Sequence, residues 1–98
     1  MKIVLSWHVL NKKIPLLKSL NWDISKAKIR QTINKPKWKG VTEEGQLTAM
    51  SLVDRGYILR VVYKRSLRAY TLKKDDGIIS VITIHIARRG RYESTKEN

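Results

Sequence analysis

The pattern of apolar and polar positions divides the chain into a helical first part and a strand-rich second part. The run from Lys2 to Ser6 predicts a short first strand. From Trp7 to Leu20 apolar residues return at roughly helical spacing. Pro15 would break a continuous helix here, so a turn followed by a short helix over 15–20 is one solution.

A second helix is predicted to end near Asn34, before Pro36. Asp23 or Ser25 can cap its first turn by accepting a free backbone amide. The side chains expected to face the core are Ile24, Ala27, Ile29 (the least well placed) and Ile33. Those expected to face outward are Lys26, Lys28 and Arg30.

Residues 35–40 are predicted to form a basic loop with Trp38 between Lys37 and Lys39. Trp38 either folds back onto the core or offers a stacking platform for an unpaired base, with the two lysines binding phosphates. Spacing alone does not separate the two interpretations.

A hairpin is predicted next, with strands at 46–53 and 57–64 around the tight-turn sequence 54–56. In the second of these strands the odd-numbered residues form the better core face. Alternation then leaves Arg60 and Lys64 on the more open face.

Segment 65–74 has two interpretations. It can extend the preceding strand so that residues 75–77 close a long hairpin, which is the favoured solution, or it can form a basic loop. The last strand, 78–87, is rich in Ile, Val and Thr, which pack well on a pleated sheet and lose side-chain freedom in a helix.

The order of these elements predicts an α+β domain, with an N-terminal strand and two helices packed on one face of a curved antiparallel sheet. Residues 1–92 form a single domain in this interpretation, and residues 93–98 form a frayed tail.

The net charge indicates what kind of partner the protein binds. The chain has 21 Lys and Arg against 8 Asp and Glu, a formal net charge of +13 spread over its whole length. Such a charge is easier to tolerate when an anionic partner neutralises part of it. Nucleic acid is the commonest such partner and binds more weakly as salt rises. An acidic protein fits the same charge, and a solvated protein without a ligand is the alternative.

Other classes of function are poorly supported. The chain has no cysteine, so disulfides and thiolate metal sites are excluded, and two histidines with scattered acids predict no metal site and no cofactor. The longest apolar run is about half a membrane span. A soluble cytoplasmic protein without a membrane partner is the expectation. No nucleotide loop, nucleophile elbow or paired carboxylates point to an ordinary metabolic enzyme.

The order of short motifs over about residues 3–92 resembles a known group of proteins. These motifs are Ser6-x-His8, Asp23-Ile24-Ser25, Asn34-Lys35-Pro36, Gly45-Gln46, Ile58 to Tyr63, Gly77-Ile78 and Val81 to His85. The pattern is similar to small uncharacterised bacterial proteins grouped with RelE/ParE/BrnT-like toxins. Departures are the long link from Tyr63 to Gly77 and the position of Pro15.

The resemblance implies two helices against a curved antiparallel sheet and a toxin of a type II toxin–antitoxin pair. Such a toxin most often cleaves RNA, either free or as ribosome-bound mRNA, and is held inactive by an acidic antitoxin protein. The family's histidine after the first strand corresponds to His8, and its strand arginine corresponds to Arg60.

Metal-independent RNA cleavage needs a base, an acid and cations that stabilise charge on the phosphate. The candidate catalytic residues are His85, Arg60 and Tyr92. The candidates for binding RNA phosphates are Arg88, Arg89, Arg91, Lys64, Lys37, Trp38 and Lys39.

Each candidate has a structural alternative. His85 and His8 are also compatible with packed, capping or solvated roles, and Tyr92 with a cover over the sheet edge. The arginines would equally serve an acidic partner. A non-enzymatic nucleic-acid-binding or protein-interaction domain is therefore the alternative to a ribonuclease toxin.

Overall fold

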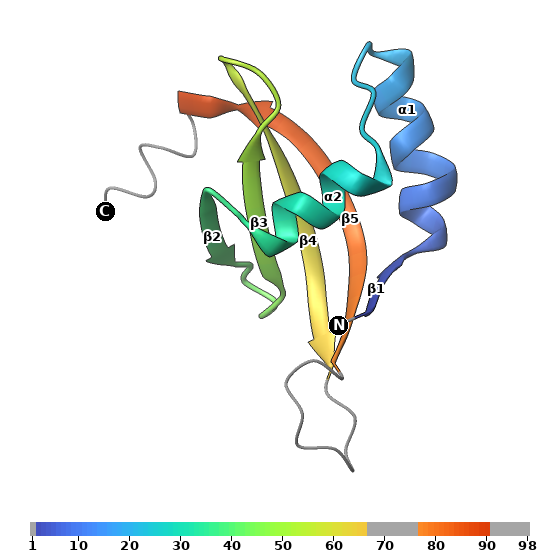
Figure 1. Cartoon of the computed structure of the whole chain (residues 1–98), viewed down its shortest axis with the longest axis vertical. Helices are drawn as coiled ribbons and strands as arrows, with labels where there is room; N and C mark the ends of the chain where they lie inside the picture. Colours follow the sequence, from blue (N-terminus) through green and yellow to red (C-terminus); the bar gives the residue numbers. More distant parts are fainter. Residues whose placement is uncertain (1, 67–76, 91–98) are drawn as a thin grey trace.

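The computed structural model describes residues 2–66 and 77–90, which form a five-stranded sheet in the order β1-β5-β4-β3-β2 (Figure 1). The strands are β1 (Lys2–Leu5), β2 (Trp38–Val41), β3 (Leu47–Leu52), β4 (Tyr57–Ser66) and β5 (Ile78–Arg88). The predicted α+β class is confirmed. The sheet is mixed rather than wholly antiparallel, because β1 pairs in parallel with β5 while the other neighbours are antiparallel.

The first helix is continuous from Trp7 to Ser19 and contains a π-helical stretch, η1 (Val9–Lys13), followed by α1 (Ile14–Ser19). The predicted interruption at Pro15 is therefore wrong. Pro15 lies in the first turn of α1, and the amide of Ile14 donates to the carbonyl of Val9 across the wider π turn. A prolyl ring normally clashes with the carbonyl four residues earlier, and a π turn directly before it gives the chain another way to continue.

The two helical segments take different places around the sheet. Helix α2 (Lys26–Asn34) lies across one face, over β3 and β4, while η1 and α1 lie alongside β5 (Figure 1). Strand β1 pairs with residues 78–81 of β5. Further along β5, at His85, the neighbouring element is η1. This arrangement covers part of an edge that would otherwise expose unpaired backbone groups.

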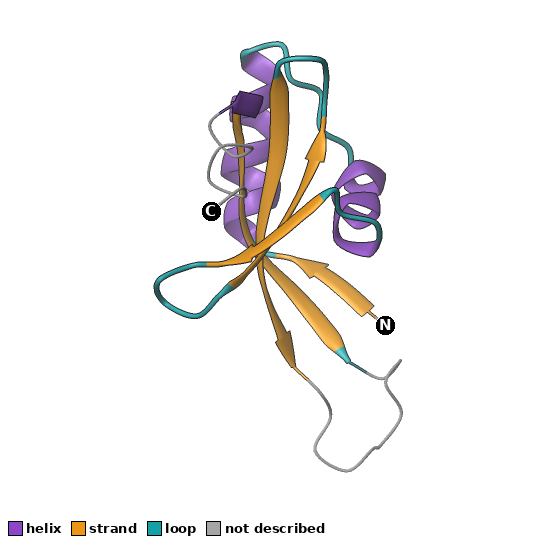
Figure 2. Cartoon of the chain, turned by 90° about the vertical axis from the view of Figure 1, so that its left-hand side faces the viewer, coloured by secondary structure: helices purple, strands orange, loops and turns teal. Residues whose placement is uncertain are grey.

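The main core lies between α2, the first helix and the sheet. Its fully buried members include Val9, Ile29, Leu59, Val61 and Ile84. Leu59, Val61 and Tyr63 lie on this side of β4, as the alternation predicted. Figure 2 shows the strong twist of the sheet, to which a register shift between Val62 and Tyr63 of β4 contributes.

Helix α2 begins at Ser25, whose hydroxyl accepts the amide of Lys28 at 3.0 Å. Ile24, Ile29 and Ile33 are buried, as predicted, whereas Ala27 is exposed. The buried stripe runs through Ile29 and Thr32. Because Thr32 is polar, the sequence pattern does not mark it as buried. Its hydroxyl donates to the carbonyl of Lys28 and contacts the hydroxyl of Ser51, so the buried group is hydrogen-bonded.

The opposite face of the sheet carries a second, smaller apolar cluster. Trp38, Met50 and Ile58 are buried there, with Leu52 packed against them. Residues 38–41 are therefore a strand and not the predicted loop, because Trp38 pairs with Met50 in β3. The amide of Lys37 also donates to the carbonyl of Met50 at 2.8 Å.

The predicted hairpin is present, with the carboxylate of Asp54 accepting the amide of Gly56 in its turn. Strand β4 extends as far as Ser66, which pairs with Ile78. The rest of the predicted extension, 67–74, lies outside the described residues, as does the predicted tail at 93–98. In the described part of the chain, no helix is long and apolar enough to cross a membrane.

Candidate nucleic-acid interface

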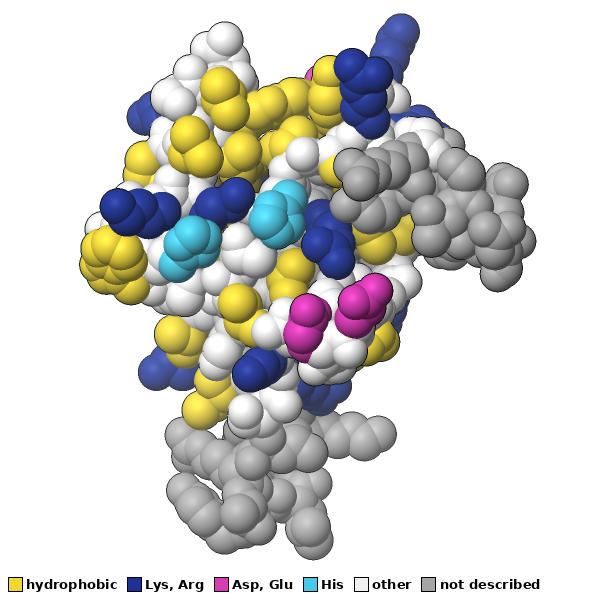
Figure 3. All heavy atoms as spheres, turned by 180° about the vertical axis from the view of Figure 1, so that it is seen from behind, with side chains coloured by type: hydrophobic (Ala, Val, Ile, Leu, Met, Phe, Trp, Pro, Cys, Tyr) yellow, Lys and Arg dark blue, Asp and Glu magenta, His cyan; other side chains and the backbone are white. Residues whose placement is uncertain are grey.

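Both histidines of the chain lie on the face of the sheet opposite α2. Figure 3 shows this face with the two imidazoles close together, Lys and Arg side chains on either side, and two acidic side chains below them. The central strands place Arg60 and His85 here. Helix α2 lies on the other side of the sheet, and the first helix borders this face along β5 (Figure 2).

Arg60 and His85 are direct partners in the antiparallel pairing of β4 with β5. Residues opposite one another in such a pair have Cβ atoms about 5 Å apart and point to the same face. Both side chains are half-buried. The register, which the sequence did not determine, thus brings together two of the three candidate catalytic residues.

A second cation reaches His85 from the first helix. The ammonium nitrogen of Lys13 lies 3.5 Å from Nδ1 of His85, a long hydrogen bond. An ammonium has only donors, so Nδ1 is the acceptor and a neutral ring carries its proton on Nε2. Lys13 is itself half-buried.

The surroundings of His85 favour its neutral form. Burial lowers the pKa of His85 below its ordinary value of 6.5, and the charges of Lys13, Arg60 and His8 lower it further. Near pH 7 the site is therefore a neutral imidazole surrounded by cations. An anion bound here would relieve the repulsion among these groups.

Ser6 fixes the start of the first helix against β5. Its hydroxyl accepts the amide of Val9 at 3.2 Å and donates to the carbonyl of Ile82 at 3.1 Å. Its own amide donates to the carbonyl of Val81 at 3.1 Å. These bonds hold His8, two residues further along, near the strand that carries His85.

A shallow groove of about 470 Å³ lies beside Arg60 and His85. The β2–β3 hairpin forms its other wall and contributes the exposed carboxylates of Glu43 and Glu44. The groove therefore offers one guanidinium and an imidazole on one wall and carboxylates on the other. Within residues 2–66 and 77–90, no three His, Asp or Glu side chains lie close enough to hold a metal ion.

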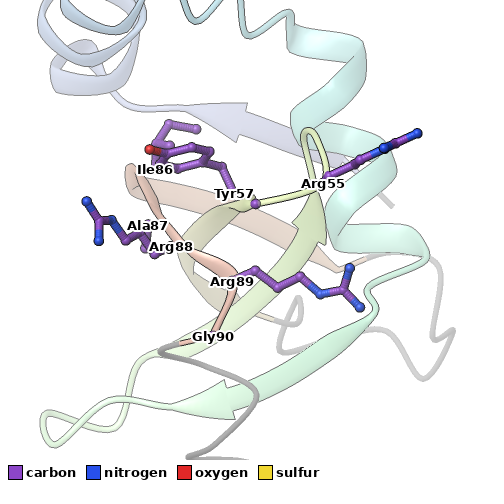
Figure 4. A pocket seen from close by; sticks show the side chains of 8 residues that line it. Arg55, Tyr57, Ile86, Ala87, Arg88, Arg89 and Gly90 are labelled. Atoms are coloured by element: carbon purple, nitrogen blue, oxygen red, sulfur yellow. The ribbon is translucent and has the colours of Figure 1, made fainter.

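Arg88 and Arg89, which were predicted to bind phosphates, do not line the groove beside His85. Arg88 and Arg89 line a separate cavity of about 740 Å³ at the β3–β4 turn, which also includes Arg55 and Tyr57. The side chains of Arg88 and Arg89 point in opposite directions there (Figure 4). Arg91 and Tyr92 lie outside the described residues.

The remaining predicted phosphate-binding residues lie at different depths. Lys64 is exposed and, by alternation along β4, shares the face of Arg60. Lys37 and Lys39 are exposed, and the ammonium of Lys37 lies 5.2 Å from the centre of the Trp38 ring. Trp38 is only 7% exposed, so its indole packs in the apolar cluster and has no free face on which a base could stack.

Sequence reasoning did not select Lys13 and gave His8 a packed or capping role. His8 is exposed, and both residues act on the charge of His85. No local pattern marks them, because they meet β5 only through the packing of the first helix. The resemblance that matched His8 was the one signal available for it.

Comparison of the chain with protein-family models, curated proteins and solved structures gives no match. The chemistry of this face therefore rests on its own residues.

The lowered pKa of His85 predicts that acid destabilises the fold. Between the folded and unfolded pKa values the unfolded chain binds more protons, so stability rises with pH in that window. The stabilising contribution is complete above pH 6.5 and is lost as the pH falls through the folded pKa. Urea unfolding at about pH 7.5 and about pH 5.5 should show a smaller acid-induced loss in His85→Gln than in the unchanged protein. Equal losses would contradict the assignment to His85.

Proposed function

We propose that the open sheet face binds single-stranded RNA and cleaves it without a metal ion, as expected for a toxin of a type II toxin–antitoxin pair. The observation that carries the proposal is the neutral His85 held between Arg60 and Lys13 beside an open groove. Two cations at one imidazole suit a phosphodiester, and a neutral imidazole near pH 7 suits a general base.

The proposed reaction begins when an RNA phosphate engages the ammonium of Lys13 and the guanidinium of Arg60. Because Lys13 then donates to the phosphate, Nδ1 of His85 is free to accept the proton of the 2′-hydroxyl. The bond from O2′ to phosphorus forms and the bond from phosphorus to O5′ breaks. His8, the second imidazole of this face, gives a proton to the leaving O5′. The products are a 2′,3′-cyclic phosphate and a free 5′-hydroxyl.

Electrostatic stabilisation in this mechanism comes mainly from Arg60. Its planar guanidinium matches two phosphate oxygens, and its place on a central strand fixes it opposite the base. The negative charge that develops on the phosphate also raises the proton affinity of His85, because it offsets the nearby cations that lower its pKa.

The test uses purified protein, a single-stranded RNA and a chelator, with the cyclic phosphate as the product to detect. The double variant Arg60→Gln/Lys13→Gln should bind a non-cleavable 2′-O-methyl RNA about tenfold more weakly. Loss of two phosphate contacts should also make the salt dependence of log K shallower by about 1.4.

The matched control is Lys26→Gln/Arg30→Gln, which removes the same charges from exposed positions on α2, on the other face of the sheet. It should bind and cleave nearly as the unchanged protein does. Salt-sensitive binding without any cleavage would replace the ribonuclease with a non-enzymatic binding module. The proposed interface would be wrong if RNA binding were unchanged between low and high salt. It would also be wrong if both double variants lost the same RNA affinity.

A further inference from the structure

Trp7 is the tryptophan that the fold leaves open to solvent. Of the three tryptophans, Trp38 is buried in the second apolar cluster and Trp22 is half-buried, with its ring 5.1 Å from that of Tyr57. The side chain of Trp7 is 67% exposed. A single exposed apolar residue needs no special explanation. A tryptophan ring beside cationic side chains, however, has the composition of a site on which a base can stack.

The first helix holds Trp7 in a defined place. Its carbonyl accepts the side-chain amide of Asn11 at 3.1 Å, and the ammonium of Lys12 lies 5.6 Å from the centre of its ring. Trp7 also directly follows Ser6, which is bonded to β5. The backbone that carries the ring is therefore held against the sheet through Ser6 and does not belong to a free loop.

The π turn determines which side chains of the first helix lie on the same side as Trp7. In a π-helix the hydrogen bond joins residues five apart, as seen between Val9 and Ile14, so such residues come to the same side. Trp7 and Lys12 are five apart and in contact. His8 and Lys13 are the next such pair, and both lie close enough to lower the pKa of His85.

We propose that Trp7 is a stacking site for an unpaired base of the RNA, directly beside the phosphate-binding cluster of Arg60, Lys13, His8 and His85. This inference rests on the proposed function and adds to it a preference for single strands. Bases inside a duplex already stack on their neighbours through both faces, whereas an unpaired, unstacked base can stack on the open face of the indole.

Charge favours a nucleic acid over an apolar protein at this site. Lys12 lies over the ring, and Lys13 follows it on the same helix, so Trp7 has cationic neighbours. A stacked base brings a phosphate within reach of these groups. Alternating aromatic and cationic groups are the usual composition of a surface that follows a single strand.

The test compares two strands of equal length, a single-stranded 2′-O-methyl octanucleotide and an abasic strand with the same number of phosphates. Trp7→Ala should bind the octanucleotide about 5- to 100-fold more weakly, as expected for one stacked base, and the abasic strand unchanged. Trp7→Phe keeps a ring and should lie within about threefold of the unchanged protein. Leu16→Ala, at another exposed apolar position of the same helix, is the matched control and should bind both strands normally.

Tryptophan fluorescence gives a second readout. The octanucleotide should quench the unchanged protein more strongly than Trp7→Phe, and the difference belongs to Trp7. If Trp7→Ala binds both strands normally while Arg60→Gln/Lys13→Gln is weakened, stacking at Trp7 is wrong and the interface stands. If the unchanged protein binds neither strand, the proposed function fails and this inference fails with it. Capture of an apolar peptide by Trp7 with no effect on the octanucleotide would assign the ring to a protein partner instead.

Discussion

Replacing His85 by glutamine is expected to slow RNA cleavage roughly 100- to 10,000-fold, the usual contribution of a general base. Glutamine keeps a polar side chain of similar length but cannot take a proton from the 2′-hydroxyl. Binding of a 2′-O-methyl RNA should remain within about threefold, because Arg60 and Lys13 still hold the phosphate. The measurement is the single-turnover rate of cyclic phosphate formation at saturating protein.

The pH dependence of that rate separates catalysis from folding. In the unchanged protein the rate should rise with pH through the pKa of His85 in the complex, and this rise should be absent from any residual activity of the variant. Ser80→Ala, at an exposed position of the same strand, is the control and should keep the full rate and its pH profile. A His85→Gln protein that cleaves at the normal rate would exclude His85 as the base.

Replacing Leu59 by alanine is expected to lower the free energy of unfolding by about 2–5 kcal/mol. Leu59 is fully buried on the central strand β4, where it is paired with Ser51 on one side and Ile86 on the other. Truncation leaves a cavity that neighbouring strands, fixed by their hydrogen bonds, cannot easily fill. Urea unfolding followed by circular dichroism should show a midpoint about 1–3 M lower.

Leu16→Ala is the control for this change, because the same atoms are removed from a side chain that is 51% exposed. Its effect should stay within about 0.5 kcal/mol. The net stability of a domain is only about 5–15 kcal/mol, so Leu59→Ala will unfold a substantial fraction of a marginal protein. Equal midpoints for the two variants would mean that the main core does not form around β4.

Local chemistry explains why some elements were predictable. The capping hydroxyl of Ser25, the turn carboxylate of Asp54 and the β-branched run before Arg88 each act over a few residues. These local preferences act in the same direction in most tertiary contexts. The α+β class follows from the order of such elements.

Other predictions were wrong where a further turn or contact outweighed the usual local preference of a residue. Pro15 normally stops a helix, but the π turn before it lets the helix continue. Residues 35–40 have the composition of a loop, but Trp38 gains a buried place when it pairs as a strand. Ala27 fits an apolar stripe, yet the helix turns toward Thr32 because hydrogen bonds satisfy the buried hydroxyl.

By itself, the sequence determined most of the types of element, their order and the excess of positive charge, because these depend on composition and near neighbours. Only the tertiary structure decided the candidate site. The register of β4 and β5 sets Arg60 opposite His85, and the packing of the first helix brings Lys13 to the same imidazole from 72 residues away. Register and helix docking depend on how whole faces pack together, and no short segment of the chain encodes them.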